Sequence, residues 1–205
     1  MAHLSYSAQL AWQFAAEQAV QSGSEFIEPV HLLLGVLDIQ RIFFAGQSAA
    51  ELFTKMSLEA VRVEWTELMN IFLHANCTPG SLRGVAEKQT VAGMCARDVS
   101  RRVSRSPKTR EIFALADTLA QEAESSMTGL IYLLAATFER EDLTTSASKQ
   151  GLDLTKLKQA LTASARSRLE SPATAFARKA FTSQTSSSLP EMEKLRLALA
   201  KRSAG

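Results

Sequence analysis

The side chains best suited to catalysis or metal binding are the two cysteines and the histidines. His74 and Cys77 lie three positions apart and Cys95 follows, so together they supply three of the residue types that bind metals. A structural zinc site requires four ligands, usually in two close pairs, and a cysteine nucleophile requires a base held by a third group. The sequence marks neither arrangement. We therefore predict no metal, no cofactor and no catalytic residue, and we interpret His31 as a hydrogen-bonding residue at the start of an apolar helix.

The charged residues indicate solvent-exposed surfaces and not a catalytic site. Acidic residues are scattered near positions 25–38, 122–124 and 139–143, at expected helix ends, whereas acid–base catalysis needs two carboxylates that converge in a cleft. The basic run 97–110 places Arg97, Arg101, Arg105 and Lys108 at three- and four-residue steps, which would share one face of a helix. Such a face could receive an acidic partner, a phosphate or nucleic acid, but it lacks interleaved aromatic residues. We interpret it as a solvated, mildly interactive face.

Composition excludes several classes of protein. With 205 residues, 46% of them hydrophobic, the chain can bury a core without a disulfide or a metal. A formal net charge of +2 produces no global field of the kind that holds DNA, so nucleic acid is disfavoured as a ligand. The apolar runs are far shorter than the roughly 20 residues needed to cross a bilayer, and no secretory signal is visible. We expect a soluble, cytoplasmic protein.

An internal repeat indicates the architecture. The segment AWQFAAEQA (11–19) aligns with IFALADTLA (112–120), placing Trp12 on Phe113, large residues on large and small on small. Ser5 and Ser106 precede these segments as expected helix caps. A second helix follows in each copy, PVHLLLGVLD (29–38) and GLIYLLAATF (129–138), after a connection that we take to be one residue shorter in the second copy.

Each copy closes on a further helical segment, residues 49–65 and 146–161, in which Ser57 and Asp153 are the expected caps. The predicted fold is all-α: a pseudo-twofold double four-helix repeat of about eight helices with a flexible C-terminal extension. We divide the chain into repeat 1 (1–70), a connection with the turn-rich NCTPGSLRG and the basic run (71–105), repeat 2 (106–170), and a linker with a short amphipathic tail (171–205).

This order of segments resembles the N-terminal (Clp repeat) domain of the Clp ATPases over roughly residues 4–165. The resemblance rests on HLLLGVL at 31–37 and GLDLTKLKQAL at 151–161. It implies a domain without catalytic activity that binds adaptors or substrate segments in front of an AAA+ ring. Because no G-x-x-x-x-G-K-[ST] motif occurs, we do not expect the chain to hydrolyse ATP.

The chain departs from the family at positions that some members use to bind phosphorylated arginine. Those members carry a glutamate just before the histidine of the second helix and a threonine at the start of the first. Val30 and Leu130 take the glutamate positions here, so we expect two apolar patches that bind an apolar segment or helix of a protein partner. The candidate binding residues are Ser5, Tyr6, Val30, Arg105, Ser106 and Leu130.

Two other functions remain open at this point. The chain could be a regulatory or sensor domain that acts on another domain of the same polypeptide, with residues 171–205 as the linker, and a gene extending past Gly205 would favour that alternative. A small helical enzyme that uses Cys77 or Cys95 is a more distant alternative, which loss of an activity on alkylation of both thiols would support.

Overall fold

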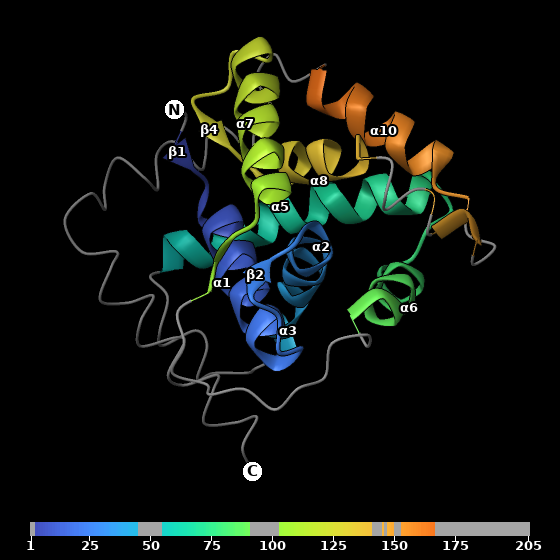
Figure 1. Ribbon diagram of the computed structural model, residues 1–205. Helices are drawn as coiled ribbons and strands as arrows, with labels where there is room; N and C mark the ends of the chain where they lie inside the picture. Colours follow the sequence, from blue (N-terminus) through green and yellow to red (C-terminus); the bar gives the residue numbers. More distant parts are fainter. Residues whose placement is uncertain are drawn as a thin grey trace.

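The structure is a computed structural model, and it describes residues 3–44, 55–90, 103–140, 145, 147–149 and 153–166. These residues are almost entirely helical (Figure 1). Their helices are α1 (Tyr6–Gln21), α2 (Pro29–Asp38), α3 (Gln40–Phe44), α5 (Lys55–His74), α6 (Pro79–Thr90), α7 (Pro107–Glu122), α8 (Leu130–Phe138) and α10 (Thr155–Arg166). Four two-residue strands accompany them: β1 (His3–Leu4), β2 (Phe26–Ile27), β3 (Ser104–Arg105) and β4 (Met127–Thr128). The all-α prediction is confirmed.

The two copies are related by a constant shift of 101 residues, from Tyr6 at the start of α1 to Pro107 at the start of α7. The same shift relates β1 to β3, β2 to β4, and the start of α2 to that of α8. The connection between the first and second helices therefore has the same length in both copies. Our prediction of a connection one residue shorter in the second copy is wrong, and the residue equivalences along the second helix move by one position.

Matching backbone hydrogen bonds determine this equal length. In the first copy, the N–H of Ser24 donates to the carbonyl of Ala19 at 2.8 Å; in the second, Ser125 donates to Ala120 at the same distance. A left-handed residue permits each turn: Gly23 has a φ of 67° and Glu124 a φ of 52°. Because glycine adopts this conformation readily and glutamate does not, only the first turn shows its usual marker in the sequence.

Strand exchange joins the two copies. β1 pairs in parallel with β4, and β2 pairs in parallel with β3, so each ladder takes one strand from each copy. The ladders continue into the caps: the N–H of Ser5 donates to the carbonyl of Thr128 at 3.0 Å, and that of Ser106 donates to Ile27 at 3.2 Å. The first helix of one copy and the second helix of the other therefore begin side by side, and this occurs twice. This reciprocal pairing confirms the pseudo-twofold arrangement.

The core is centred on α2 and α8, in which nearly every side chain is buried. A helix that is apolar on all faces belongs in the interior of a domain. α5 extends across the molecule and contacts α1, α8 and α10 (Figure 1). Gly35 lets α2 approach α1 closely, because a Cβ at this position would overlap the backbone of Ala11 and Ala15. None of the described helices contains an apolar stretch sufficient to cross a bilayer.

α6 corrects the predicted loop at NCTPGSLRG. Pro79 is the first residue of this helix, a position that suits proline because the missing N–H would have no partner there. The hydroxyl of Thr78 accepts from the N–H of Ser81 at 3.1 Å and so caps the first turn. The predicted cap Ser57 is also wrong, because α5 begins before it at Lys55. The carboxylate of Asp153 accepts from the N–H of Thr155, the first residue of α10, at 2.8 Å. The predicted cap is therefore one residue too early, because Leu154 holds the cap position and its carbonyl accepts from the N–H of Lys158 at 2.8 Å.

Ion pairs attach one outer helix to each copy. α6 packs on α2, and α10 packs on α8. Asp38, at the end of α2, is buried and accepts from Arg83 of α6 at 2.6 Å and from Gln18 of α1 at 2.7 Å. Glu139, which is the equivalent of Asp38 in the second copy, lies 3.3 Å from the Nζ atom of Lys158 in α10.

Candidate functional site

The predicted cap Ser5 is buried and belongs to the framework of the fold. Its hydroxyl accepts from the N–H of Ala8 at 3.2 Å, which caps α1, and donates to Oε2 of Glu64 at 3.0 Å. The same oxygen of Glu64 accepts from the N–H of Leu130 at 3.1 Å. One buried carboxylate of α5 therefore lies between the N-terminal ends of α1 and α8. Negative charge is favoured there, because helix N-termini carry unpaired N–H donors and the positive end of the macrodipole.

Gly129 makes room for this carboxylate. A Cβ at position 129 would lie 2.9 Å from Oε2 of Glu64. The equivalent position in the first copy holds Glu28, and the N–H of Glu28 donates to Nδ1 of His31 at 3.0 Å. The two copies thus stabilise the start of their second helix differently, one through a nearby histidine and the other through a distant glutamate. Our sequence reasoning did not identify Glu64.

Ser106 caps α7 in the way that Ser5 caps α1. Its hydroxyl accepts from the N–H of Thr109 at 3.1 Å and donates to the hydroxyl of Thr109, also at 3.1 Å. Thr109 in turn donates to the carbonyl of Ile27 at 2.6 Å. This buried chain of hydrogen bonds connects α7 to the strand that leads into α2.

The predicted pairing of Val30 with Leu130 is wrong, because the constant shift makes Ile131 the equivalent of Val30. Leu130 has a relative exposure of 0% and Ile131 is also buried, whereas Val30 is half-buried. Tyr6 is buried as well. The structure thus places four of the six candidate residues inside the fold and leaves Val30 and Arg105 accessible.

His31 is a buried, neutral histidine. Nδ1 accepts from the N–H of Glu28, and Nε2 lies 3.0 Å from the hydroxyl of Ser22, which itself donates to the carbonyl of Ala19. Burial lowers the pKa of His31 to about 4, against a smaller opposing effect of a backbone hydrogen bond with Phe26. The predicted hydrogen-bonding role at a helix start is confirmed.

His74, the last residue of α5, and Cys77, in the α5–α6 connection, each have separate neighbours. His74 lies 2.6 Å from the carbonyl of Asn70, while Cys77 is buried and contacts Ser81. Among the residues that the structure describes, no group of three or more His, Cys, Asp and Glu side chains could hold a metal ion. Burial raises the pKa of the Cys77 thiol, which disfavours the nucleophilic thiolate form. Cys95 lies outside the described residues.

An aromatic pair marks the pseudo-twofold axis at the surface. Trp12 and Phe113 are equivalent residues of α1 and α7, and their rings meet edge to face with centroids 5.5 Å apart. Equivalent residues can contact each other only close to the axis that relates them. The guanidinium of Arg105 lies over both rings, 5.4 Å from the centroid of Trp12 and 5.1 Å from that of Phe113. Arg105 is exposed and Trp12 is half-buried, so this cluster reaches the solvent.

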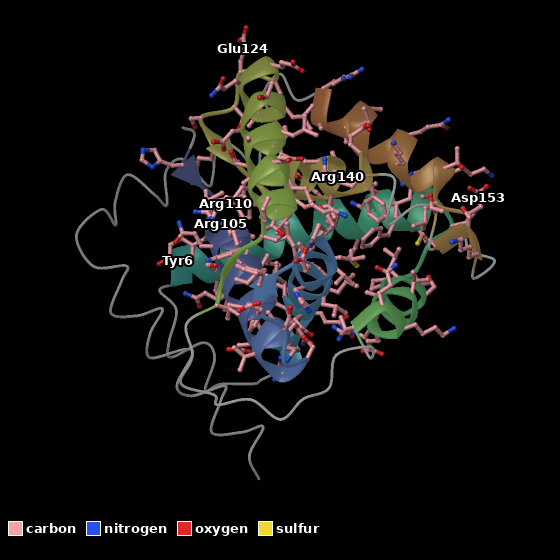
Figure 2. All side chains as sticks on the ribbon, in the orientation of Figure 1. Tyr6, Arg105, Arg110, Glu124, Arg140 and Asp153 are labelled. Carbon is pink, nitrogen blue, oxygen red and sulfur yellow. The ribbon has the colours of Figure 1, made fainter. Side chains whose placement is uncertain are left out.

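Two further equivalent pairs belong to the same region of α1, α7 and the strands before them. Gln9 of α1 corresponds to Arg110 of α7, one turn before Trp12 and Phe113, and Leu4 of β1 corresponds to Arg105 of β3. Gln9 donates to the carbonyl of Leu4 at 3.0 Å, whereas Arg110 is exposed. We call Leu4, Gln9, Trp12, Arg105, Arg110 and Phe113 the axial surface. Figure 2 labels Arg105 and Arg110 where α7 begins beside α1.

The basic run does not form the single helical face that we considered. Arg105 lies in β3, ahead of the cap Ser106, and only Lys108 and Arg110 are in α7. Arg97, Arg101 and Arg102 lie outside the described residues. The basic run itself contains no aromatic residue, but α1 and the second turn of α7 supply two aromatic rings beside Arg105. The lack of aromatics within the run therefore gave no guide to its surroundings in the fold. The alignment of Trp12 with Phe113 was the available signal for this cluster.

Two large apolar side chains of the described residues are exposed in addition to the axial surface. Leu73, near the end of α5, has a relative exposure of 72%, and Phe26 in β2 has 39%. Phe43 is half-buried and packs against Trp65, with ring centroids 6.5 Å apart. The side chain of Phe44 lies outside the described residues. Phe26 is the register partner of Ser104, so it lies on the strand that pairs beside Arg105.

Comparison with known proteins bears on the fold alone. No protein-family model and no curated protein sequence matches the chain. Among solved structures, it is similar to the Hsp104 N-terminal domain from Candida albicans, with 14% sequence identity over 84% of this chain and 99% of that one, and a TM-score of 0.59. A structure from investigations of a malarial protein secretion system matches with 15% identity over 82% of this chain and 98% of that one, and a TM-score of 0.56. The chain thus has a fold like that of the Clp N-terminal domains, as the sequence resemblance implied.

Proposed function

We propose that the chain is a protein-binding module without catalytic activity, which recruits an adaptor or a substrate segment as Clp N-terminal domains do. The axial surface carries this proposal. It combines the half-buried ring of Trp12, which packs on the buried ring of Phe113, with the exposed guanidinium of Arg105. Aromatic residues and arginine are the side chains enriched in protein interfaces. The position of this surface is fixed, because the caps and the exchanged strands hold the starts of α1 and α7 in place.

The buried candidate residues have a supporting role in this proposal. Ser5 and Ser106 determine where α1 and α7 begin, and Leu130 anchors α8 to Glu64. Since the side chains of these residues cannot reach a partner, the proposed contact moves from two separate patches to a single one at the axis. Of the residues first considered, Arg105 contributes directly.

Affinity capture with matched variants tests the proposal. The full chain is immobilised and exposed to an extract of its native cells, alongside the double variant Gln9→Asp, Arg105→Asp and the control Arg62→Asp. Arg62 is an exposed arginine of α5 whose ion pair is with Glu59 of the same helix, so its loss should leave the axial surface intact. We expect a captured protein to be lost with the double variant and retained with the control. Equal capture by both variants would count against the axial surface as the binding site.

A further inference from the structure

The arginines of the axial surface differ from the other arginines that the structure describes. Four of those others form ion pairs with a carboxylate: Arg41 and Arg83 with Asp38, Arg62 with Glu59, and Arg140 with Glu111. Arg166 is the last residue of α10, where the negative end of the helix dipole stabilises a cation. For Arg105 and Arg110, no carboxylate of the described residues lies within ion-pair distance.

The electrostatic surroundings of these two arginines lower the stability of the folded chain. Arg105 and Arg110 are both exposed and flank the first turn of α7, which contains no acidic residue. A helix N-terminus disfavours positive charge, and two neighbouring cations repel each other. A negatively charged group from outside would relieve both effects. The equivalent residues Leu4 and Gln9 of the first copy are uncharged, so the charge of this arginine pair belongs to one side of the axis only.

The position of Arg105 suits a carboxylate better than a diffuse anion. Its guanidinium carbon lies 5.4 Å from the centroid of Trp12 and 5.1 Å from that of Phe113, beside two rings that are nearly perpendicular to each other. A guanidinium carries five N–H donors in a planar fork that matches the two oxygens of a carboxylate. Arginine binds carboxylates through two parallel hydrogen bonds, and the aromatic rings reduce the freedom that Arg105 would lose on binding. The half-buried ring of Trp12 provides apolar area beside the charge.

From this charge complementarity we infer that the axial surface binds an acidic segment of a partner protein, in which an aspartate or glutamate stands next to an aromatic or other apolar side chain. The carboxylate pairs with Arg105, Arg110 extends the positive field along α7, and the apolar side chain covers Trp12. This inference rests on the proposed function, since it specifies the chemistry of the segment that the module recruits.

Fluorescence anisotropy with the full chain tests the inference. The probe is a labelled peptide in which aspartate and phenylalanine alternate, and the matched peptide has asparagine in place of aspartate. We expect the aspartate peptide to bind at least tenfold more tightly than the asparagine peptide, and to weaken with added salt because screening reduces the attraction. Arg105→Gln should weaken its binding about tenfold and Arg110→Gln by a smaller factor. The control Arg62→Gln should leave binding unchanged.

Three results would overturn the inference. Equal binding of the two peptides, with capture of the native partner still lost in the Gln9→Asp, Arg105→Asp variant, would remove the acidic preference and leave the proposed function standing. Failure of both peptides to bind, with native capture also unaffected by that variant, would remove both. Displacement of the peptide by single-stranded DNA at lower concentration than by unlabelled peptide would identify nucleic acid as the ligand class instead.

Discussion

Replacement of Gly35 by alanine should strongly destabilise the chain, although the same change in another helix should stabilise it. In both helices, alanine gains about 1 kcal/mol over glycine in helix propensity. At Gly35 the added Cβ would lie 2.6 Å from the backbone nitrogen of Ala15 and would overlap the carbonyl oxygen of Ala11. These are backbone atoms, so no change of rotamer can relieve the contact.

The clash at Gly35 can be relieved only if α1 and α2 separate. Both helices contribute many buried side chains to the core, and their separation would loosen the packing between them in the first copy. Overpacking of a core typically costs about 1 to 3 kcal/mol, and a backbone contact belongs at the upper end of that range. After the propensity gain is subtracted, Gly35→Ala should lower the free energy of unfolding by about 2 kcal/mol.

Gly84 provides the matched control. It also lies within a helix, α6, but a Cβ there would meet no atom within 4 Å. Gly84→Ala should therefore raise the free energy of unfolding by about 0.5 to 1 kcal/mol. Urea denaturation followed by circular dichroism measures both changes, provided that the m-value stays constant. A Gly35→Ala variant as stable as the native chain would refute the proposed close approach of α1 and α2, and a destabilised Gly84→Ala variant would refute the attribution of the difference to packing.

The remaining predictions concern single residues of the framework. The pKa of His31 is about 4 in the folded chain and near 6.5 in the unfolded chain, so between these pH values the unfolded chain binds more protons. The free energy of unfolding should therefore be at its full value above about pH 6.5 and should fall toward pH 4, by up to about 3 kcal/mol. A stability curve over pH should lose this slope in His31→Gln, and an unchanged slope would show that another group titrates. Glu64→Ala removes the acceptor of two buried donors and should cost about 3 kcal/mol in urea denaturation, whereas Glu64→Gln, which retains an acceptor oxygen, should cost less than half as much. Glu124→Gly should raise the free energy of unfolding by about 1 kcal/mol, since glycine accepts a φ of 52° without strain; a loss of stability would mean that the glutamate side chain contributes more than its backbone costs.

The local features of the fold could be predicted from the sequence. Ser5 and Ser106 were identified as caps because an N-cap requires only a short polar side chain before a helix. The equivalence of Trp12 and Phe113 followed from the pattern of large and small residues along one helix. Their mutual contact could also be deduced in principle, since equivalent residues of a twofold repeat can meet at the axis.

Features that depend on distant or unusual residues were missed. The turn at Glu124 lacked the glycine that marks its counterpart, so the alignment slipped by one residue along the second helix. Pro79 suggested a loop, although proline is equally suited to the first turn of a helix. The role of Glu64 depends on two residues that lie 59 and 66 positions away in the chain, and local spacing carries no trace of it. The two-residue strands are too short for any alternating pattern to reveal them.

The exchanged strands bear on how such a chain could originate. A chain with one copy alone would have two strands without partners, and a second identical chain would satisfy both by the same reciprocal exchange. A half-length ancestor is therefore expected to have been an obligate homodimer, whose stability depended on its concentration. Gene fusion would have removed that dependence and allowed the halves to evolve separately. The contrasts between Leu4 and Arg105, and between Glu28 and Gly129, are the kind of divergence that only a fused chain can accumulate.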